Sequence, residues 1–159
     1  LHAFMLIQSG IPVIYSGDEV GQVNDYTYKE DPEKREDSRY IHRGKFCWDL
    51  EEKIDEPGTV QDRLFHALRK LEVLRARDAV FDSRVPFYMA QTGDISVLCL
   101  VRRGEKETAM GIFNFSRDAR RIRVEDSSVP DTFTDMLSGE EKNIRDIALP
   151  GFGFFWLRA

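Results

Sequence analysis

Residues 10–21 read Gly-Ile-Pro-Val-Ile-Tyr-Ser-Gly-Asp-Glu-Val-Gly. Within this run, Ile11–Tyr15 is short and almost wholly apolar, which is typical of a strand that is buried on both faces of a parallel sheet. The preceding residues, Leu1–Gln8, have the pattern of the end of an apolar helix, which Ser9-Gly10 terminates. A helix, a tight glycine turn and a buried strand make half of an α/β repeat. One repeat cannot close a core, so the pattern predicts a piece cut from a larger protein.

The chain changes character after this strand. From Gly17 to Gly58 it is rich in charged residues, tyrosine and glycine without any period, and a loop of that length is uncommon unless it is functional or disordered. The aromatic side chains embedded in it argue against disorder. Thr59 then caps a helix, with an acid at the capping-box position, Asp62. Its apolar positions are spaced by four, four, three and three residues, at Val60, Leu64, Leu68, Leu71 and Leu74. We expect it to end near Asp78.

Beyond the helix the apolar period switches to two. Seven strands are predicted, at Val85–Gln91, Ile95–Arg102, Thr108–Phe115, Arg120–Val124, Thr132–Leu137, Arg145–Leu149 and Phe152–Arg158. Short strands separated by turn residues at this spacing indicate an antiparallel sandwich or barrel. In the fourth strand Ile122 and Val124 alternate with Arg121 and Arg123, so we expect one face of it to be wet.

The predicted fold is therefore mainly β. Residues 80–159 form a C-terminal antiparallel β-sandwich domain. Residues 1–79 are the remnant of a truncated (β/α)₈ TIM barrel, comprising the end of helix 7, strand 8, a long substrate-side loop and helix 8. In such barrels the residues just past a strand lie on the catalytic face, which here begins at Ser16.

Composition narrows the function classes. Of 159 residues 42% are hydrophobic, which suits a packed core, and the formal net charge is −5 with scattered basic residues. The densest basic run, Arg120–Arg123, is typical of a solvated strand face, so we expect no nucleic-acid partner. The first apolar run is too short and too broken for a signal peptide or a membrane span, so we expect no membrane partner.

The cysteines and histidines show no metal-ligand spacing, so we expect no metal and no cofactor. Cys47 and Cys99 lie far apart in the sequence, and each is interpreted as a small buried or half-buried apolar residue. That usage fits a reducing compartment, and we expect a cytoplasmic protein.

Two motifs carry a family resemblance. The stretch Gly10–Gly21 resembles the eighth-strand segment of glycoside hydrolases and transglycosylases of the α-amylase family. Within that family, Asn24-Asp25 together with Asp37-Ser38-Arg39-Tyr40-Ile41-His42-Arg43 most resembles amylosucrase, although Tyr40 stands where amylosucrases usually carry Trp. The resemblance covers nearly the whole chain, more loosely in the sandwich. It implies a retaining double displacement at an α-glucosidic bond, with sucrose or an α-glucan as substrate.

The resemblance also implies roles for four loop residues in the intact enzyme. Arg39 helps to close the substrate subsite beside the scissile bond through a salt bridge to an upstream Asp, and a guanidinium suits both carboxylate and sugar hydroxyls. His42 either contacts substrate or pins the loop. Asp25 and Asp37 either support Arg39 or serve only the loop.

No catalytic residue is expected in the chain itself, because the resemblance places the nucleophile, the acid–base and the third acid upstream of Leu1. Asp18 and Glu19 look like a catalytic pair, but adjacent residues on an extended chain point to opposite sides, which favours a loop-positioning role. The expected partners are therefore the substrate, the upstream barrel and, for the isolated chain, further copies of itself. The alternative is a stand-alone carbohydrate-binding or structural β-sandwich module.

Overall fold

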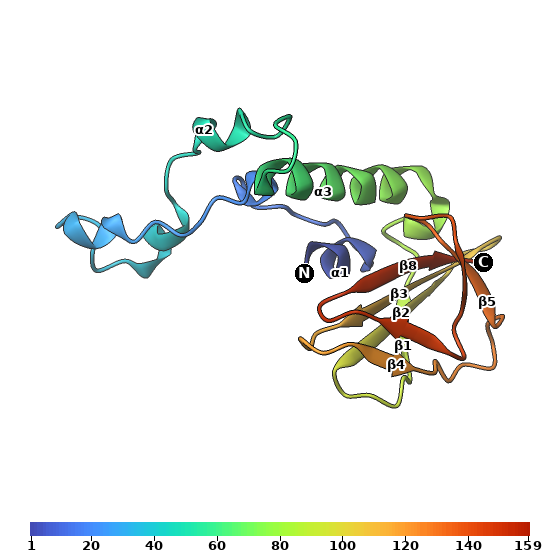
Figure 1. The fold of residues 1–159 in the computed structure, drawn as a ribbon. Helices are drawn as coiled ribbons and strands as arrows, with labels where there is room; N and C mark the ends of the chain where they lie inside the picture. The colour runs from blue at the N-terminus through green and yellow to red at the C-terminus, as the bar shows by residue number, and fades with distance from the viewer. The chain divides into compact units, whose positions relative to one another are not determined.

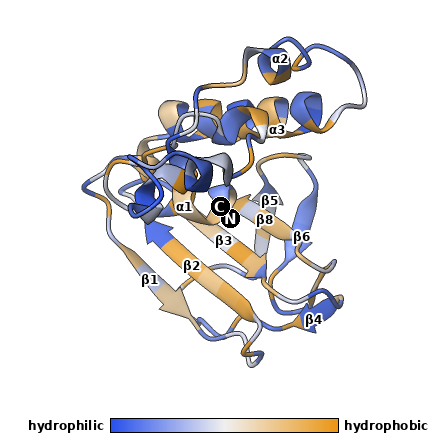
Figure 2. Ribbon diagram, turned by 90° about the vertical axis from the view of Figure 1, so that its left-hand side faces the viewer, coloured by the Kyte–Doolittle hydropathy of each residue, from blue (hydrophilic) through white to orange (hydrophobic).

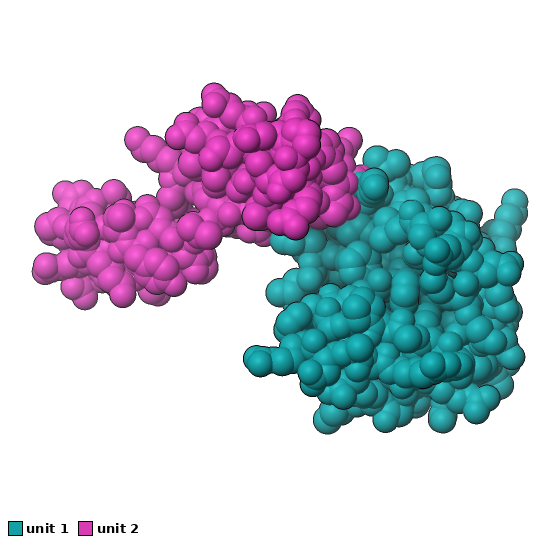
Figure 3. Space-filling model, in the orientation of Figure 1, with its two compact units in different colours: residues 1–12, 70–159 teal, residues 13–69 magenta.

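The computed structural model describes residues 1–159, which divide into two compact units (Figure 3). The first unit comprises residues 1–12 and 70–159, and the second comprises residues 13–69. The longest helix begins in the second unit and ends in the first. The expected division at residue 79 concerns the parent protein and stays a prediction.

Figure 1 shows the order of the elements along the chain. The α-helices are α1 (His2–Ile7), α2 (Trp48–Glu51) and α3 (Val60–Arg77), and the 3₁₀ helices are η1 (Asp18–Val20), η2 (Thr27–Glu30), η3 (Ser38–His42) and η4 (Ala79–Phe81). The strands are β1 (Phe87–Ala90), β2 (Val97–Arg103), β3 (Thr108–Asn114), β4 (Arg120–Ile122), β5 (Thr132–Asp135), β6 (Glu141–Asn143), β7 (Ile147–Leu149) and β8 (Phe154–Arg158).

The strands of the first unit form two sheets, and every pair is antiparallel. The larger sheet has the order β1-β2-β3-β8-β5-β6, and the smaller one pairs β4 with β7. All seven predicted strands are present, each shorter than predicted, and β6 was missed because its sequence, Glu-Lys-Asn, has no apolar residue. The wet face of β4 is confirmed, since Ile122 and Val124 are buried while Arg121 and Arg123 are exposed.

The core of this unit lies against one face of the larger sheet. Figure 2 shows β2 and β3 as the most continuously hydrophobic strands. The buried cluster draws on both sheets and the turns between them: Val97, Cys99, Val101, Met110, Ile112, Ile122, Val124, Val129, Phe133, Ile144, Ile147, Leu149 and Leu157. Burial of apolar side chains from two sheets is what stabilises a β-sandwich.

The opposite face of the larger sheet is also covered. Helix α1 packs on β3, where Gly111 leaves room for it: a Cβ there would lie 2.5 Å from Ile7 Cδ1. Trp156 on β8 is fully buried, donates a hydrogen bond from Nε1 to the Ala3 carbonyl (3.2 Å) and lies 5.0 Å from the Phe81 ring of η4. The centre of the sheet is therefore apolar on both sides, which explains the burial of nearly every residue along β2 and β3.

Two arginines fasten the end of α1 within this unit. The guanidinium of Arg102, whose residue is 0% exposed, donates to the carbonyls of Ile7 and Gln8 and to those of two residues near β1, Asp82 and Val85. Arg75 of α3 donates to three carbonyls of the same helix end, those of Leu6, Gln8 and Gly10. Carbonyls left unpaired at a helix C-terminus carry partial negative charge, so the two cations satisfy them.

The strand predicted at Ile11–Tyr15 is not formed. These residues have no ladder partner, and the side chains of Ile11 and Val13 are 87% and 76% exposed. A strand exists only by pairing, and the chain supplies no neighbour for this one, so the barrel unit expected at residues 1–79 is not seen. The predicted helix is confirmed as α3, and the Oγ1 of Thr59 accepts the backbone N–H of Asp62 (3.0 Å), as a cap does.

Candidate functional site

The turn that follows the extended segment is built on a glycine. Gly17 has φ +101°, which lets the chain reverse into η1. The carboxylate of Glu19 accepts the backbone N–H of Gly17 (2.8 Å) and so closes the turn on itself. The bond shows the predicted contact of Glu19 with neighbouring backbone, and its role in positioning the loop stays a prediction. The premise was wrong, because Asp18 and Glu19 lie in a 3₁₀ helix and not on an extended chain.

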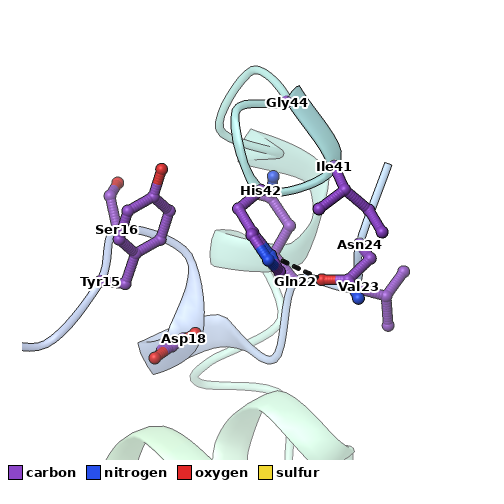
Figure 4. A pocket seen from close by; sticks show the side chains of 9 residues that line it. All are labelled: Tyr15, Ser16, Asp18, Gln22, Val23, Asn24, Ile41, His42 and Gly44. Carbon is purple, nitrogen blue, oxygen red and sulfur yellow. Dashed lines mark hydrogen bonds between the residues drawn. The ribbon is translucent and has the colours of Figure 1, made fainter. Parts of the chain in front are cut away.

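Two segments of the second unit, residues 22–25 and 41–47, lie side by side and form what we call the loop neck. The backbone N–H of Asp25 donates to the carbonyl of Ile41 (2.9 Å). One residue away, His42 Nδ1 and Asn24 Oδ1 are 3.1 Å apart, the hydrogen bond drawn in Figure 4. The neck closes off residues 26–40, which we call the charged loop.

Gln22 provides the third connection across the neck, and sequence reasoning missed it. Its Nε2 donates to the Lys45 carbonyl (3.0 Å), and its Oε1 accepts the Cys47 N–H (2.9 Å). The side-chain amide thus occupies the place of a backbone peptide in a strand ladder. The sequence signal is a glutamine after a Gly-x-x-x-Gly turn, and it is too weak to predict these two bonds from the sequence alone.

Glycines leave the space that the neck needs. A Cβ on Gly17 would lie 3.0 Å from the Cβ of Gln22, and a Cβ on Gly44 would lie 3.2 Å from the Cβ of Asp25. Both distances are tighter than ordinary contact, so larger residues at either glycine would push the bonded side chains away.

A small hollow of about 50 Å³ opens beside the neck. Figure 4 shows the residues that line it: Tyr15, Ser16, Asp18, Gln22, Val23, Asn24, Ile41, His42 and Gly44. A hollow of this size holds only a few water molecules, so by itself it cannot enclose a sugar ring. His42 and Asp18, which lie 24 positions apart in the sequence, both line it.

Arg39 and Asp37 form a two-pronged ion pair at the start of η3. Arg39 Nε lies 2.8 Å from Asp37 Oδ1, and its Nη2 lies 2.7 Å from Oδ2. The hydrogen bonds from the Arg39 side chain and backbone lower the pKa of Asp37 to about 2. The Arg39 side chain is 72% exposed, so the pair faces solvent.

The same tripeptide, Asp-Ser-Arg, recurs at residues 82–84 in the first unit with the same bonds. Arg84 Nε and Nη2 lie 2.9 and 3.0 Å from the two oxygens of Asp82, and the Arg84 N–H donates to Oδ1 (2.9 Å) as the Arg39 N–H does to Asp37. The pairing is therefore a property of the tripeptide. By itself it is not evidence of a substrate site.

The other predicted site residues are placed as follows. Asp25 accepts hydrogen bonds from the hydroxyl (2.6 Å) and the backbone N–H (2.9 Å) of Thr27, the first residue of η2, and these bonds lower the pKa of Asp25. Asp37 supports Arg39 directly, and His42 bonds across the neck to Asn24. Contact of any of the four with substrate stays a prediction.

Aromatic side chains lie within the charged loop and shortly after it. The ring of Tyr40 has two cations over it, the Lys34 Nζ at 5.9 Å and the Arg43 Cζ at 5.7 Å from its centroid. Trp48 on α2 is 68% exposed and meets Phe46 edge to face at 4.8 Å. An exposed tryptophan offers a flat apolar face.

No group of three or more His, Cys, Asp or Glu side chains is arranged to hold a metal ion. Both cysteines are free; Cys99 is buried, which raises the pKa of its thiol to about 12, and Cys47 is half-buried. None of the helices combines the length and the apolar character needed to cross a bilayer.

The fold is shared with parts of larger amylase-type enzymes. A maltogenic amylase from S. marinus aligns with 99% of this chain and 18% of its own, at 20% identity and a TM-score of 0.64. A cyclic α-maltosyl-(1→6)-maltose hydrolase from Arthrobacter globiformis aligns with 99% of this chain and 29% of its own (23% identity, TM-score 0.64). For an α-amylase from Anoxybacillus the values are 98% and 30%, with 20% identity and a TM-score of 0.68.

Sequence comparison points the same way. The chain is 27% identical over 158 residues to a cyclomaltodextrinase from Geobacillus thermopakistaniensis strain MAS1, covering 97% of this chain and 24% of that protein. The chain thus spans about a quarter of the length of this relative. No family model matches it. These likenesses support the resemblance to the C-terminal region of α-amylase-superfamily enzymes, and none of them supports the narrower resemblance to amylosucrase.

Proposed function

We propose that this chain is the C-terminal portion of an α-amylase-family enzyme acting on α-glucosidic bonds. One observation carries the proposal: a single alignment to a cyclomaltodextrinase extends over 97% of the chain, across both units. A free-standing sandwich module would have no use for residues 13–69, whereas an enzyme uses such loops to shape its substrate side. In this proposal the first unit is structural, and the second supplies the substrate-side loop.

The chemistry that we propose for the longer protein is a retaining double displacement, with its carboxylic acids in the part that precedes Leu1. Within this chain Arg39 and His42 would face the substrate, with Asp37 and Asp25 supporting the loop. The motif Asp37–Arg43 favours an amylosucrase-like enzyme that takes sucrose, while the cyclomaltodextrinase likeness favours α-glucan hydrolysis. We propose the α-glucosidic bond as the shared target.

The exposed segment Ile11–Tyr15 supports an upstream partner. Ile11, Val13 and Tyr15 alternate along an extended backbone and are 87%, 76% and 53% exposed. Unpaired edges and apolar faces of this kind associate with other chains. We expect the isolated chain to self-associate in light scattering and the double variant Ile11→Lys, Val13→Lys to be monomeric. A wild-type chain that stays monomeric at high concentration would contradict this.

Turnover assays test the enzymatic proposal. The longer protein and the 159-residue chain are each incubated with sucrose, a cyclomaltodextrin and maltoheptaose, and the products are separated by chromatography. We expect turnover of at least one substrate by the longer protein and none by the chain alone. Glucan formation from sucrose would favour transfer, and ring opening would favour hydrolysis. Turnover by the chain alone would overturn the placement of the acids.

A second candidate is a carbohydrate-binding module. The exposed faces of Trp48 and Tyr26, 68% and 59% exposed, favour it, because sugar rings stack on such surfaces. Calorimetry of the chain against maltoheptaose and sucrose separates the two proposals. The fragment proposal predicts no affinity tighter than about 1 mM. Micromolar binding that is lost in Trp48→Ala would favour the module.

A further inference from the structure

The loop neck joins the charged loop to the rest of its unit, and three side-by-side connections hold the neck together. The outermost is the backbone bond from Asp25 to Ile41, next comes the Asn24–His42 bond, and the innermost is Gln22. Gln22 alone makes two bonds with one side chain, to the carbonyl of Lys45 and the N–H of Cys47. Its backbone N–H is held as well, by the Gly17 carbonyl (2.8 Å).

The surroundings of Gln22 suit this connection. Gly17, in its left-handed conformation, packs its bare Cα side against the Gln22 side chain, where a Cβ would lie 3.0–3.2 Å from three of its atoms. The segment it grips, residues 45–47, continues from Gly44, whose missing side chain admits Asp25. The turn at Gly17–Gln22 and the far side of the neck are thus tied through one amide group.

We propose that Gln22 is a positioning residue: it fixes the neck, and through the neck it fixes where Arg39 and His42 stand. Arg39 lies two residues before Ile41, the acceptor of the neck's backbone bond, and His42 lies within the neck. The Arg39–Asp37 pair sets only the local shape of the tripeptide, since residues 82–84 adopt it too. The position of Arg39 in the unit therefore depends on the neck. The proposal rests on the proposed function only in what it says of substrate.

The first experiment tests whether Gln22 holds the loop neck closed. It uses the 159-residue chain, without any substrate. Residues 26–43 hold five trypsin sites, at Lys29, Lys34, Arg35, Arg39 and Arg43. In Gln22→Ala we expect limited trypsin cleavage in this region to rise about tenfold, because the neck loses two side-chain hydrogen bonds and opens more often. Gln61→Ala is the matched control: Gln61 is also half-buried, and it donates one amide bond, to the Val20 carbonyl (3.3 Å), outside the neck.

The variant Gln22→Glu separates the two hydrogen bonds of the Gln22 side chain. The carboxylate keeps an acceptor for the Cys47 N–H but loses the donor to the Lys45 carbonyl. We therefore expect hydrogen exchange at the Cys47 amide to stay slow in Gln22→Glu and to become about tenfold faster in Gln22→Ala. Equal trypsin cleavage in wild type and Gln22→Ala would overturn the claim that Gln22 holds the neck closed. Faster exchange of the Cys47 amide in Gln61→Ala than in Gln22→Ala would overturn it as well.

The second experiment uses the longer enzyme. If Gln22 positions substrate-side residues, Gln22→Ala raises KM about tenfold with kcat within about twofold, and Gln61→Ala changes neither. An opened neck with unchanged KM would overturn the positioning role. Failure of the proposed function is seen separately, as a wild-type longer protein that turns over none of the three sugars.

Discussion

The two units of this chain are stabilised by different interactions. In residues 13–69 only Val20 and Leu68 are buried apolar side chains, and the segment keeps its shape through hydrogen bonds between side chains and backbone, long-range at Gln22 and local at Asp25. In the other unit a two-sided sheet buries large apolar residues such as Trp156 and Phe133 almost completely. A buried large side chain contributes about 1.5–3 kcal/mol, whereas a hydrogen bond nets about 0.5–1.5 kcal/mol.

This difference predicts a stable first unit and a second unit that opens more easily. We expect the first unit to unfold only when its apolar core is exposed. We expect the second unit to open locally when a few hydrogen bonds break, which is typical of binding loops. Four predictions test this contrast, in order of decreasing effect on stability.

The chain has two tryptophans, one in each unit. Replacing each by alanine should give the largest difference between the units in lost unfolding free energy. Trp156 is fully buried and hydrogen-bonded, so Trp156→Ala should lower the free energy of unfolding by about 4 kcal/mol. Trp48 is 68% exposed and makes one edge contact, so Trp48→Ala should cost about 1 kcal/mol or less. Urea unfolding followed by far-UV circular dichroism measures both. Equal losses would mean that the second unit has an apolar core of its own.

A buried arginine of the first unit and an exposed arginine of the second should differ in the same way. Arg102 is buried, with its pKa lowered to about 10 by burial, and its loss would remove one donor from each of four carbonyls. Those of Gln8, Asp82 and Val85 keep a second donor. We expect Arg102→Met to cost about 3 kcal/mol in urea unfolding. Arg39→Met should leave the midpoint unchanged, because Arg39 faces solvent. A harmless Arg102→Met would show that Arg102 does not contribute to fastening α1, whose end Arg75 also holds.

The cap of α3 should have a smaller effect. Thr59 Oγ1 accepts the Asp62 N–H, and removing that acceptor leaves one donor of the first turn unpaired. Thr59→Ala should cost about 1 kcal/mol, whereas Thr59→Ser, which keeps the oxygen, should cost little. Hydrogen exchange of the first turn of α3 measures the loss. Identical exchange in both variants would contradict the cap.

The sequence predicts the apolar part of this structure well and the polar part poorly. The positions of α3 and of seven strands follow from periodicity, because the residues that repeat are the ones buried. Burial of Arg102 does not follow, because its position on β2 looks like any strand end until α1 is known to cover that face. Ile11–Tyr15 has the composition of a strand, but composition cannot supply the neighbour that a strand requires.

The candidate site shows the same limit. The motif around Arg39 drew attention to residues 37–43, and the tripeptide alone produces its ion pair, as residues 82–84 demonstrate. What holds the loop is Gln22, whose two bonds reach residues 23 and 25 positions away. Long-range bonds from a single polar side chain leave no period in the sequence, so only the structure reveals them.

The repeated tripeptide provides the finest test of the contrast. If the ion pair is local, Asp37 and Asp82 both titrate below their ordinary value although they lie in different units, with Asp37 at about 2. Carboxyl-carbon NMR measures both midpoints. Arg39→Gln should raise the pKa of Asp37 toward about 3.9 and leave Asp82 alone, and Arg84→Gln should do the reverse.

The sign of the effect on stability follows from these pKa values. A carboxyl group whose pKa is lowered by folding stabilises the fold above its unfolded pKa, and that stabilisation is lost as the pH falls from about 4 through about 2 for Asp37. Because both pairs face solvent, we expect the loss to be small and to shrink further in salt. An Asp37 that titrates near 4 while Asp82 stays low would show that Arg39 leaves its local partner in solution. Its guanidinium would then be free for a carboxylate or a sugar, and the tripeptide would behave differently in the two units.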